Sequence, residues 1–493
     1  MQAIGFDNEQ YLNTQSEQIR HRIAQFGGKL YLEFGGKLFD DMHASRVLPG
    51  FAPDSKIRML QHLKDDVEIV ITINAADIES NKVRADFGIT YDVDVLRLID
   101  TFREMGLYVG SVVLTQYMGQ PSAKAFLKRL ETLGIRSYRH YPIVGYPSDV
   151  EYIVSEEGLG KNEYIETTHS LIVVTAPGPG SGKMATCLSQ LYHDHKRGIQ
   201  AGYAKFETFP IWNLPLKHPV NLAYEAATAD LDDVNMIDPF HLEAYGKTAV
   251  NYNRDVEIFP VLNAIFERIQ GDSPYKSPTD MGVNMAGNCI IDDEVCRHAS
   301  RMEILRRYYA ACVKRVRGHD NVHEINKLKL LMNQADTTPD IFPCVAIALQ
   351  KAEKTCAPAC ALQLPDGRIV TGKTSDTLGA ASAMILNALK MLAGLEDIEL
   401  IDASVLEPIC ALKTGYLLHR NPRLHVDEVL LALTISALHN ENAKLAMQQL
   451  SRLKGSEVHF SVIISDDDER LLRRLGINVS CQPMYETKRL YHK

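Results

Sequence analysis

The chain has 493 residues, of which 45% are apolar and 23% are charged, and its net charge is −9 at pH 7. A chain of this length folds as roughly two to four domains, and its negative charge argues against a general nucleic-acid binder. The longest apolar run, near residues 429–438, is too short to cross a bilayer, and the N-terminal segment lacks the pattern of a secretion signal. We therefore expect a cytoplasmic protein that binds neither nucleic acid nor a membrane.

Nine cysteines are scattered along the chain. The closest pair, Cys356 and Cys360, has no partner pair at the spacing of a zinc ribbon. We expect reduced thiols, most of them in hydrophobic cores, and no zinc site.

Helices and strands alternate along the first 145 residues. The predicted helices cover 9–26, 56–63, 94–105 and 121–133, and the predicted buried strands cover 67–75, 107–117 and 135–143. Residues 29–39 are interpreted as a hairpin that turns at Gly35-Gly36. The alternation predicts a doubly wound, mostly parallel α/β sheet. Ligands bind at the carboxyl ends of the strands in such sheets, where we expect Asn74, Asp77, Thr115 and Gln116.

A glycine-rich turn follows the next predicted strand, 171–174, and precedes a predicted helix that begins after Lys183. Glycines allow backbone N–H groups to approach an anion, and the helix N-terminus and the lysine add positive charge. The turn departs from the P-loop pattern at Pro177 and Met184, where that pattern has glycine and a hydroxyl residue. A purely structural glycine turn is the alternative. The predicted phosphate-binding residues are Gly178, Gly180, Ser181, Gly182 and Lys183.

The segment 203–246 opens with a short predicted strand, 203–206, and is then rich in carboxylates, amides and histidines. Such a mixture suits Mg²⁺ or a polar substrate. The alternative is a solvated loop with helix caps, because Asp and Asn are ordinary cap and turn residues.

Helical spacing dominates from residue 251 to residue 333, with predicted helices at 251–269, 292–317 and 324–333. Beyond Asp336 the pattern changes to a hairpin with a Pro365-Asp366-Gly367 turn, an alanine-rich helix, and further strands at 399–404, 457–465 and 477–482. The predicted domains are an α/β domain with a P-loop-like turn over residues 1–225, a helical subdomain over 226–335 and an α/β domain over 336–493.

The C-terminal hairpin and its alanine-rich helix resemble the core of the cytidine-deaminase fold. The hairpin and the helix carry neither the HxE nor the PCxxC zinc motif of that family, so we do not expect deamination. A polar run at 419–428 is interpreted as the entry to a helix rather than as a binding site.

Several stretches resemble a bacterial family of uncharacterised proteins, known as a domain of unknown function. The resemblance covers essentially the whole chain and rests on long motifs: YLEFGGKLFDDMHASRVLPGF, VTAPGPGSGKMATCLSQ, NYNRDVEIFPVL, SPTDMGVNM and LKGSEVH. It implies an α/β N-terminal region with a helical subdomain and a C-terminal domain of cytidine-deaminase-like topology. It implies no activity and no catalytic residues.

A second, weaker resemblance concerns mechanism. A glycine loop with a lysine, a strand and then a segment bearing His and Asp are similar in layout to the ATP-dependent amidoligase domain of CTP synthase. The layout implies that Lys183 stabilises a transferring phosphoryl group, that Glu207 and Asp230 or Asp238 bind Mg²⁺, and that His218 or His241 contacts the substrate.

Three functions are compatible with the sequence. The leading one is an ATP- or nucleotide-dependent ligase or phosphotransferase that acts on a small polar metabolite. The second is a protein that binds or senses a nucleotide or phosphorylated metabolite without catalysis, which Pro177 and Met184 favour. The third is an oligomeric structural protein with a structural glycine loop. We expect a phosphorylated small-molecule ligand and a homo-oligomer.

Overall fold

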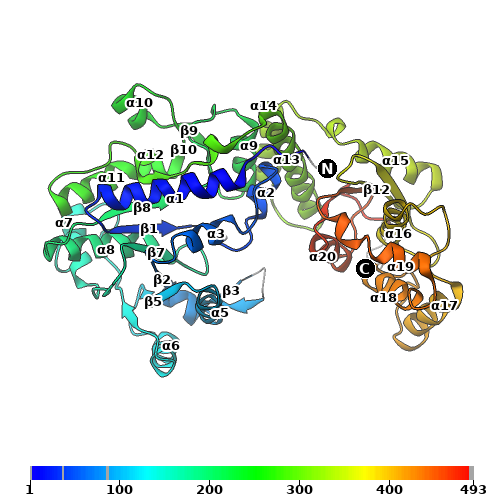
Figure 1. Ribbon diagram of the computed structural model, residues 1–493, viewed down its shortest axis with the longest axis horizontal. Helices are drawn as coiled ribbons and strands as arrows, with labels where there is room; N and C mark the ends of the chain where they lie inside the picture. Colours follow the sequence, from blue (N-terminus) through cyan, green and yellow to red (C-terminus); the bar gives the residue numbers. More distant parts are fainter. Residues whose placement is uncertain (1–2, 36–37, 85–87, 488–493) are drawn as a thin grey trace. The chain divides into compact units, whose positions relative to one another are not determined.

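The computed structural model describes residues 3–35, 38–84 and 88–487. The chain divides into two compact units (Figure 1). We call residues 4–225 with 232–299 the N-terminal unit, and residues 300–493 with 226–231 the C-terminal unit. Helix α13 (Asp293–Val316) runs from one unit into the other. The predicted helical region 226–335 is therefore shared between the two units.

A seven-stranded sheet organises the N-terminal unit, and its strands are all parallel. This confirms the predicted α/β class. The strands in spatial order are β11 (Gly282–Val283), β8 (Gly202–Phe206), β1 (Leu30–Phe34), β7 (Leu171–Thr175), β2 (Val67–Asn74), β5 (Tyr108–Thr115) and β6 (Ser137–Arg139).

Helices precede or connect these strands, and the predicted helices at 9–26, 56–63, 94–105 and 121–133 correspond to α1, α3, α5 and α6. The helices of this unit before α13 are α1 (Asn8–Gln25), α2 (Met42–Val47), α3 (Ser55–His62), α4 (Ala75–Glu79), α5 (Tyr91–Glu104), α6 (Pro121–Thr132), α7 (Val150–Ile153), α8 (Lys183–Lys196), α9 (Pro219–Ala227), α10 (Pro239–Tyr245), α11 (Asn253–Gln270) and α12 (Pro278–Met281). Two antiparallel pairs, β3 (Val83–Arg84) with β4 (Ile89–Thr90) and β9 (Asn235–Ile237) with β10 (Val250–Tyr252), lie outside the main sheet.

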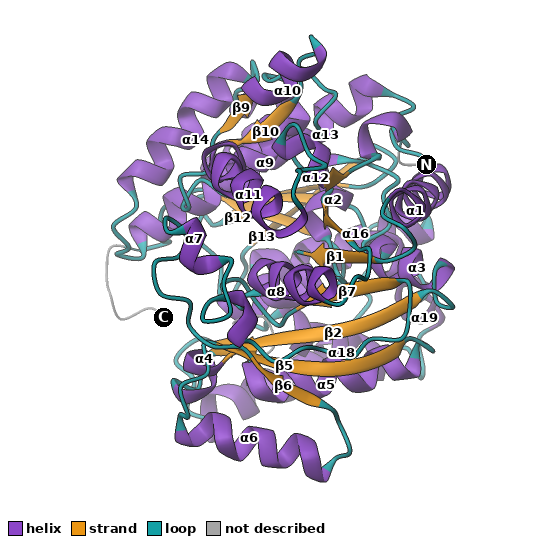
Figure 2. Cartoon of the chain, turned by 90° about the vertical axis from the view of Figure 1, so that its left-hand side faces the viewer, coloured by secondary structure: helices purple, strands orange, loops and turns teal. Residues whose placement is uncertain are grey.

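One face of the sheet packs against α8 and α11. Tyr31 of β1, Ile172 of β7 and Tyr203 of β8 share a buried cluster with Leu188 of α8 and Phe259 of α11. Because side chains alternate across a strand, every second residue of these strands points to this face. Helix α8 lies along β1 and β7, as Figure 2 shows.

The predicted hairpin at 29–39 is wrong. Strand β1 pairs in parallel with β7 on one side and β8 on the other, and Leu38 and Phe39 form no strand. Gly36, in the predicted turn, lies outside the described residues. A double glycine is typical of a hairpin turn, but local sequence does not reveal that both edges of β1 are occupied by distant strands.

The strand order creates a crevice position on each side of β7. After β1 the chain crosses to β2, which lies beyond β7 in the sheet. After β7 it crosses in the opposite direction to β8, which lies beyond β1. Right-handed crossovers in opposite directions place the two connections on opposite faces of the sheet. Ligands in open α/β sheets bind at such reversals, beyond the carboxyl ends of the strands. The glycine turn after β7 occupies this position.

The C-terminal unit has a mixed four-stranded sheet, ordered β13 (Ile369–Lys373), β12 (Ala359–Gln363), β14 (Glu457–Phe460) and β15 (Asn478–Cys481). Strand β12 is antiparallel to β13 and β14, and β14 and β15 are parallel. The predicted Pro-Asp-Gly hairpin is confirmed as β12–β13. Its helices beyond α13 are α14 (Val322–Gln334), α15 (Pro343–Thr355), α16 (Ala380–Ala393), α17 (Ala403–Ala411), α18 (Val426–Ser436), α19 (Glu441–Met447) and α20 (Asp466–Arg474).

The predicted strand at 399–404 is wrong, because these residues lead into α17. Asp402 caps that helix by accepting a hydrogen bond from the backbone N–H of Ser404. The apolar run Leu400-Ile401 suggested a strand, but the cap decides the local structure. Along the described chain, no helix is both long and apolar enough to cross a membrane.

Candidate functional site

The glycine turn alternates in backbone handedness from one residue to the next. Proline fixes a negative φ at Pro179, Gly180 has φ +73°, Ser181 does not have a positive φ, and Gly182 has φ +82° before Lys183 opens α8. Successive residues of opposite handedness aim their N–H groups into one concavity, which is a nest for an anion. The two glycines are needed because other residues rarely adopt a positive φ.

The backbone N–H groups of this nest are available to donate hydrogen bonds to a ligand. Within the described residues, none of the backbone N–H groups from 180 to 185 donates a hydrogen bond to a protein group, and the first to do so is that of Thr186, to the carbonyl of Gly182 at 2.9 Å. The first N–H groups of any helix lack partners, and here they continue the run that begins in the turn. The combination offers one anion several converging donors.

The turn is held in place by the carboxyl ends of β2 and β5, as the sequence predicted for Asn74 and Thr115. The Asn74 side chain donates to the carbonyl of Gly180 at 3.3 Å, and the Thr115 hydroxyl donates to the carbonyl of Ser181 at 2.7 Å. These bonds fix the carbonyls towards the sheet. The N–H groups are left to face the other way.

Two of the predicted phosphate-binding residues have a packing role. A side chain at Gly178 would come within 2.4 Å of the Tyr91 hydroxyl, so glycine is required there for close packing. The Ser181 side chain is buried and accepts a hydrogen bond from the Thr72 hydroxyl at 3.2 Å. Its backbone N–H remains in the nest. The prediction that these five residues bind phosphate stays a prediction.

Lys183 is half-buried, and no acidic side chain among the described residues forms an ion pair with it. The buried thiol of Cys187 follows one turn along α8. Burial raises the pKa of that thiol, the Glu33 carboxylate raises it further, and Lys183 opposes the rise. Cys187 therefore stays a neutral core thiol. Lys183 opens the helix that continues the nest, and in the part of the chain that the structure describes it has no ion-pair partner.

The ends of β1 and β8 place a second polar group on the same face of the sheet. Glu33 of β1 is in register with Lys205 of β8 and with Val174 of β7. Both side chains follow Tyr31 and Tyr203 at a two-residue interval, so they point to the face that α8 covers. The carboxylate of Glu33 thus lies between the turn after β7 and Lys205, and it accepts a hydrogen bond from the Tyr203 hydroxyl at 2.8 Å.

Lys205 is the centre of a buried network, which we call the Lys205 cluster: Lys205, Glu207, Tyr252 and Asp255. The ammonium of Lys205 contacts the Glu207 carboxylate at 3.2 Å and also bonds the Tyr252 hydroxyl and the Asp255 carboxylate. Burial opposes the charge on Lys205, but Tyr252 and the carboxylates hold its pKa well above its ordinary value.

In this cluster the ammonium of Lys205 is the shared ion-pair partner of two buried carboxylates, those of Glu207 and Asp255. Burial raises the pKa of Glu207 to about 7, the charge of Lys205 opposes that rise, and the nearby Asp255 carboxylate adds to it. Two carboxylates that share a buried site do not both ionise easily. Glu207 therefore exchanges a proton near neutral pH, which is the property of a general acid or base.

The two predicted catalytic histidines have structural partners. The buried ring of His218 contacts the carboxylate of Asp293 at 2.9 Å, where it joins the start of α9 to the start of α13. His241 is in the first turn of α10, and its ring contacts the Ser277 hydroxyl at 3.1 Å. Burial lowers the pKa of His218, against the opposing effect of Asp293. The structure gives neither histidine a contact with the glycine turn.

The three predicted metal ligands are not brought together. Asp238 caps α10 through one oxygen and accepts hydrogen bonds from Thr279 with the other, at 2.6 and 3.2 Å. Asp230 is exposed and belongs to the C-terminal unit, whereas Glu207 belongs to the N-terminal unit. Across the described ranges, no group of three or more His, Cys, Asp or Glu side chains is arranged to hold a metal ion.

Sequence reasoning did not single out Glu33, Tyr252 or Asp255. A signal was present for Glu33, because a carboxylate interrupts the apolar run Leu30–Phe34 one residue before the strand ends. Asp255 and Tyr252 gave no such signal, because they reach the sheet edge from the start of α11. Only the packing of α11 on the sheet reveals that position.

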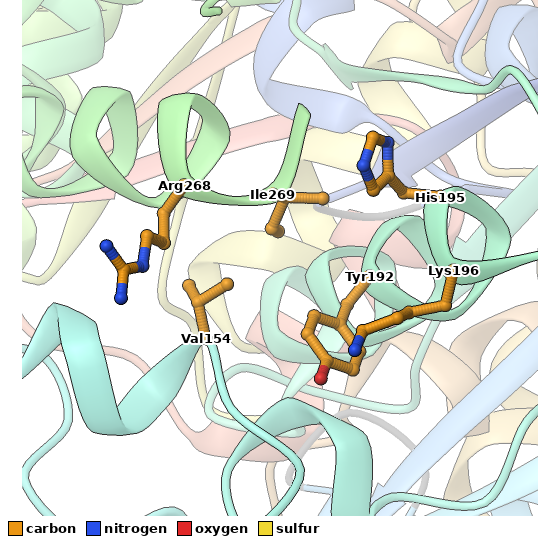
Figure 3. Close-up of a pocket in the computed structure, with 6 residues that line it drawn as sticks. All are labelled: Val154, Tyr192, His195, Lys196, Arg268 and Ile269. Carbon is orange, nitrogen blue, oxygen red and sulfur yellow. The ribbon is translucent and has the colours of Figure 1, made fainter. Parts of the chain in front are cut away.

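The surface hollow of about 440 Å³ drawn in Figure 3 lies at the other end of α8, beside Tyr192, His195 and Lys196. The ammonium of Lys196 pairs with Glu156 at 2.9 Å, and Arg268 pairs with Glu151 at 3.3 Å. The cations of this hollow are therefore already neutralised by surface carboxylates. The nest at the start of α8 is the better candidate.

Two family models match the chain. The one described as "Domain of unknown function DUF1846, N-terminal" matches residues 4–336, and the one described as "Domain of unknown function DUF1846, C-terminal" matches residues 340–491. The chain belongs to this family. The resemblance inferred from the sequence motifs is thereby confirmed at the level of the family.

Relatives match over the whole length. The chain is 59% identical to a UPF0371 protein of Streptococcus thermophilus (strain CNRZ 1066) over 494 residues, and the alignment covers 100% of both chains. UPF0371 proteins of Streptococcus pyogenes serotype M5 and Streptococcus sanguinis are 58% identical over 494 residues, again with 100% of both chains covered. These descriptions state no activity, so the function must be inferred from the site.

Proposed function

We propose that the protein binds the phosphate groups of a nucleotide, ATP in the first instance, in the nest at residues 180–185, and that it acts as an ATP-dependent ligase or phosphotransferase on a small polar metabolite. The observation that carries the proposal is a turn of alternating handedness whose N–H groups, like the ammonium of Lys183 next to them, have no partner among the described residues. Backbone donors and a helix N-terminus bind phosphate without further side chains.

The Lys205 cluster supplies the second half of the site. It lies at the end of β8, on the same face of the sheet as the nest, and Glu33 lies between the two. An acceptor hydroxyl or carboxyl bound there attacks the γ-phosphorus, the bond to the bridging oxygen breaks, and the nucleoside diphosphate leaves. Lys183 neutralises charge on the transferring group, and Glu207 takes the proton of a hydroxyl acceptor.

Magnesium accompanies nucleoside triphosphates, and it keeps several waters when one or two carboxylates hold it. Glu33 is the carboxylate next to the nest, and within the described residues its second oxygen accepts no hydrogen bond from a protein group. We assign to Glu33 the contact with a Mg²⁺ ion that arrives with the nucleotide. Glu207 is tied to Lys205 and serves the proton transfer instead.

Met184 favours a second candidate function, a protein that binds a phosphorylated ligand without turnover. This residue follows the lysine, and its side chain packs against the hydrophobic cluster of α8 and the sheet. A thioether in that position cannot ligate Mg²⁺ as a serine or threonine hydroxyl does. Turnover then depends on Glu33 alone for the metal contact.

A thermal-shift panel with ATP, ADP, inorganic pyrophosphate and phosphate, each with and without Mg²⁺, tests the proposal. A ligand present at about 100 times its dissociation constant stabilises the protein by about 2.7 kcal/mol. We expect stabilisation by ATP that is reduced in Lys183→Ala, to about 0.4–1.4 kcal/mol at the same ligand concentration, and kept in Lys196→Ala, a lysine at the opposite end of the same helix. Mg²⁺-dependent release of ADP distinguishes the enzyme from the binding protein. No shift with any phosphate ligand contradicts both.

We infer further that the C-terminal unit has a cytidine-deaminase-like topology without deaminase chemistry. The antiparallel pair β12–β13 is followed by the alanine-rich α16, which packs on both strands. Neither the β12–β13 hairpin nor α16 carries an HxE or a PCxxC motif. This unit therefore contributes no zinc-activated water to the proposed reaction.

A further inference from the structure

Helix α18 of the C-terminal unit exposes an apolar stripe although its other side already fills the core. Val426, Val429 and Leu433 pack inside the unit. On the opposite side the side chains of Leu431, Ile435 and Leu438 are 66, 52 and 74% exposed. These three residues follow one another at four and three positions, so they form one stripe, which we call the α18 face.

The segment before α18 also has exposed apolar residues. The apolar side chains of α17, Val405, Leu406, Ile409 and Cys410, pack only partly against the core, and α17 contacts α18 (Figure 1). A π-helical turn, Leu412–Tyr416, continues it, and Tyr416 and Leu418 are strongly exposed. Single exposed apolar residues are ordinary on protein surfaces, but a continuous stripe on a helix marks a contact surface.

The polar residues at the two ends of the α18 face are complementary, a carboxylate and an imidazole. Asp427 is exposed in the first turn of α18, and His439 is exposed in the turn just after the helix. Asp427, Leu431 and Ile435 follow each other at intervals of four, which places them on one ridge of the helix, and His439 continues that spacing beyond its end. Along the sequence, Asp427 and His439 are each six residues from Leu433, and Leu431 and Ile435 are each two residues from it.

We propose that the α18 face binds a second copy of this chain, with the two α18 helices packed antiparallel about a twofold axis at Leu433. That axis places Leu431 against Ile435 of the second copy and Asp427 against His439 of the second copy. A two-fold contact requires a surface that is complementary to itself, and this ridge has that property. A parallel pairing instead places the carboxylate of Asp427 against the same carboxylate of the second copy.

The mass of the full-length protein in solution, measured by sedimentation velocity over a concentration series, tests the proposal. We expect the wild type to self-associate and Leu431→Asp to dissociate, with a dissociation constant raised more than about thirtyfold, as for a residue at the centre of an interface. Asp427→Lys weakens the association, and the double variant Asp427→Lys with His439→Glu restores it. That restoration reports the antiparallel register, which a purely structural role of these residues would not produce.

Leu330→Asp is the matched control, because Leu330 is 55% exposed on α14, away from the α18 face. It should leave the association unchanged, and circular dichroism should show both variants folded. A wild type that is monomeric throughout the concentration series overturns the proposal. So does an oligomer that survives Leu431→Asp, since the face then covers another part of the chain or binds a different partner.

Discussion

Glu207 shows how a single residue acquires a functional property from its surroundings. Its carboxylate shares the ammonium of Lys205 with Asp255, and burial raises its pKa to about 7. Glu33, one strand away, bonds the Tyr203 hydroxyl. The raised pKa of Glu207 therefore suits it to proton transfer near neutral pH.

The raised pKa of Glu207 has a consequence for stability. Between its ordinary pKa, 4.5, and about 7, the folded protein holds a proton that the unfolded chain has released. Stability must therefore fall as the pH rises through this window, by about 1–3 kcal/mol. Urea unfolding at pH 5 and pH 7.5 should show this fall in the wild type and a smaller one in Glu207→Gln. Glu131→Gln, at an exposed site, should behave as the wild type, and an equal fall in all three proteins would contradict the assignment.

At the scale of elements, α8 carries the site because both of its ends are fixed. Its N-terminus continues the glycine turn, and its C-terminal half is anchored by Asp194. That buried carboxylate accepts hydrogen bonds from Lys29 at 2.8 Å, Tyr31 at 2.7 Å and Tyr164 at 2.9 Å. The anchor ties α8 to β1, the strand that carries Glu33.

We expect Asp194→Asn to destabilise the N-terminal unit by about 3–5 kcal/mol, because it leaves the ammonium of Lys29 without a counter-charge. Tyr164→Phe removes one hydrogen bond and should cost about 1 kcal/mol. Chemical denaturation followed by circular dichroism measures both. Equal costs for the two variants would show that the charge of Asp194 does not anchor α8.

In the C-terminal unit, His425 and Asp468 join the start of α18 to α20 at 3.0 Å. The hydrogen bond to Asp468 raises the pKa of His425. Burial opposes the ionisation of Asp468, but His425, the backbone N–H of Val426 and Ser465 together hold its pKa below the ordinary value. The histidine contributes stability below its ordinary pKa and loses that contribution as the pH rises through its raised pKa. The aspartate contributes above its ordinary pKa and loses its contribution as the pH falls through its lowered pKa. The pair is thus most stabilising between the ordinary pKa values of the two groups, near 4 and 6.5.

His425→Gln should therefore lower the stability more at pH 5.5 than at pH 8.5. The difference should be below about 1 kcal/mol, because the ring is partly exposed and solvent screens the pair. Urea titrations at the two pH values measure it, with the exposed His419→Gln as the control. If His425→Gln lowered the free energy of unfolding by the same amount at both pH values, the ion pair of His425 with Asp468 would contribute nothing to stability.

At the scale of the whole molecule, the boundary between the two family matches does not coincide with the boundary between the compact units. The family models meet between residues 336 and 340, whereas the C-terminal unit includes the chain from residue 300 onward. Arg306 of α13 explains the difference. It binds both oxygens of Glu457 at 2.8 Å, and Val313 of the same helix belongs to the core of this unit.

A fragment of residues 300–493 should accordingly be more stable than a fragment of residues 340–493. The shorter one lacks Arg306 and leaves Glu457 as a buried carboxylate without its counter-charge, a loss of about 3–5 kcal/mol. Melting curves of the two purified fragments measure the difference. Equal melting temperatures would contradict the assignment of α13 to the C-terminal unit.

The parallel sheet, its helices and the position of the glycine turn could be predicted from the sequence because their signals are local. Apolar runs, helix periodicity and the Pro-Asp-Gly turn each depend on a few neighbouring residues. Neither the strand order nor the pairing of β1 between β7 and β8 is local, so the hairpin prediction failed at Gly35. The Lys205 cluster was missed for the same reason, since Asp255 reaches the sheet edge through the packing of α11.

The ligand roles assigned to Asp238 and His241 illustrate a second limit. Their residue types suit metal or substrate, but a helix cap and a hydroxyl contact use the same types. Sequence alone gives no way to separate these uses. The free backbone donors of the glycine turn, in contrast, follow directly from its glycine spacing and the start of α8.

The most direct test of the account is the affinity of the full-length protein for ATP and for inorganic pyrophosphate, measured by titration calorimetry in the wild type, Lys183→Ala and Lys196→Ala. We predict that both ligands bind the wild type and Lys196→Ala alike, and that Lys183→Ala weakens both by about tenfold to a hundredfold, the effect of one charged hydrogen bond. Equal binding by all three proteins, or no binding by the wild type, would contradict the claim that the turn at the start of α8 is a phosphate site.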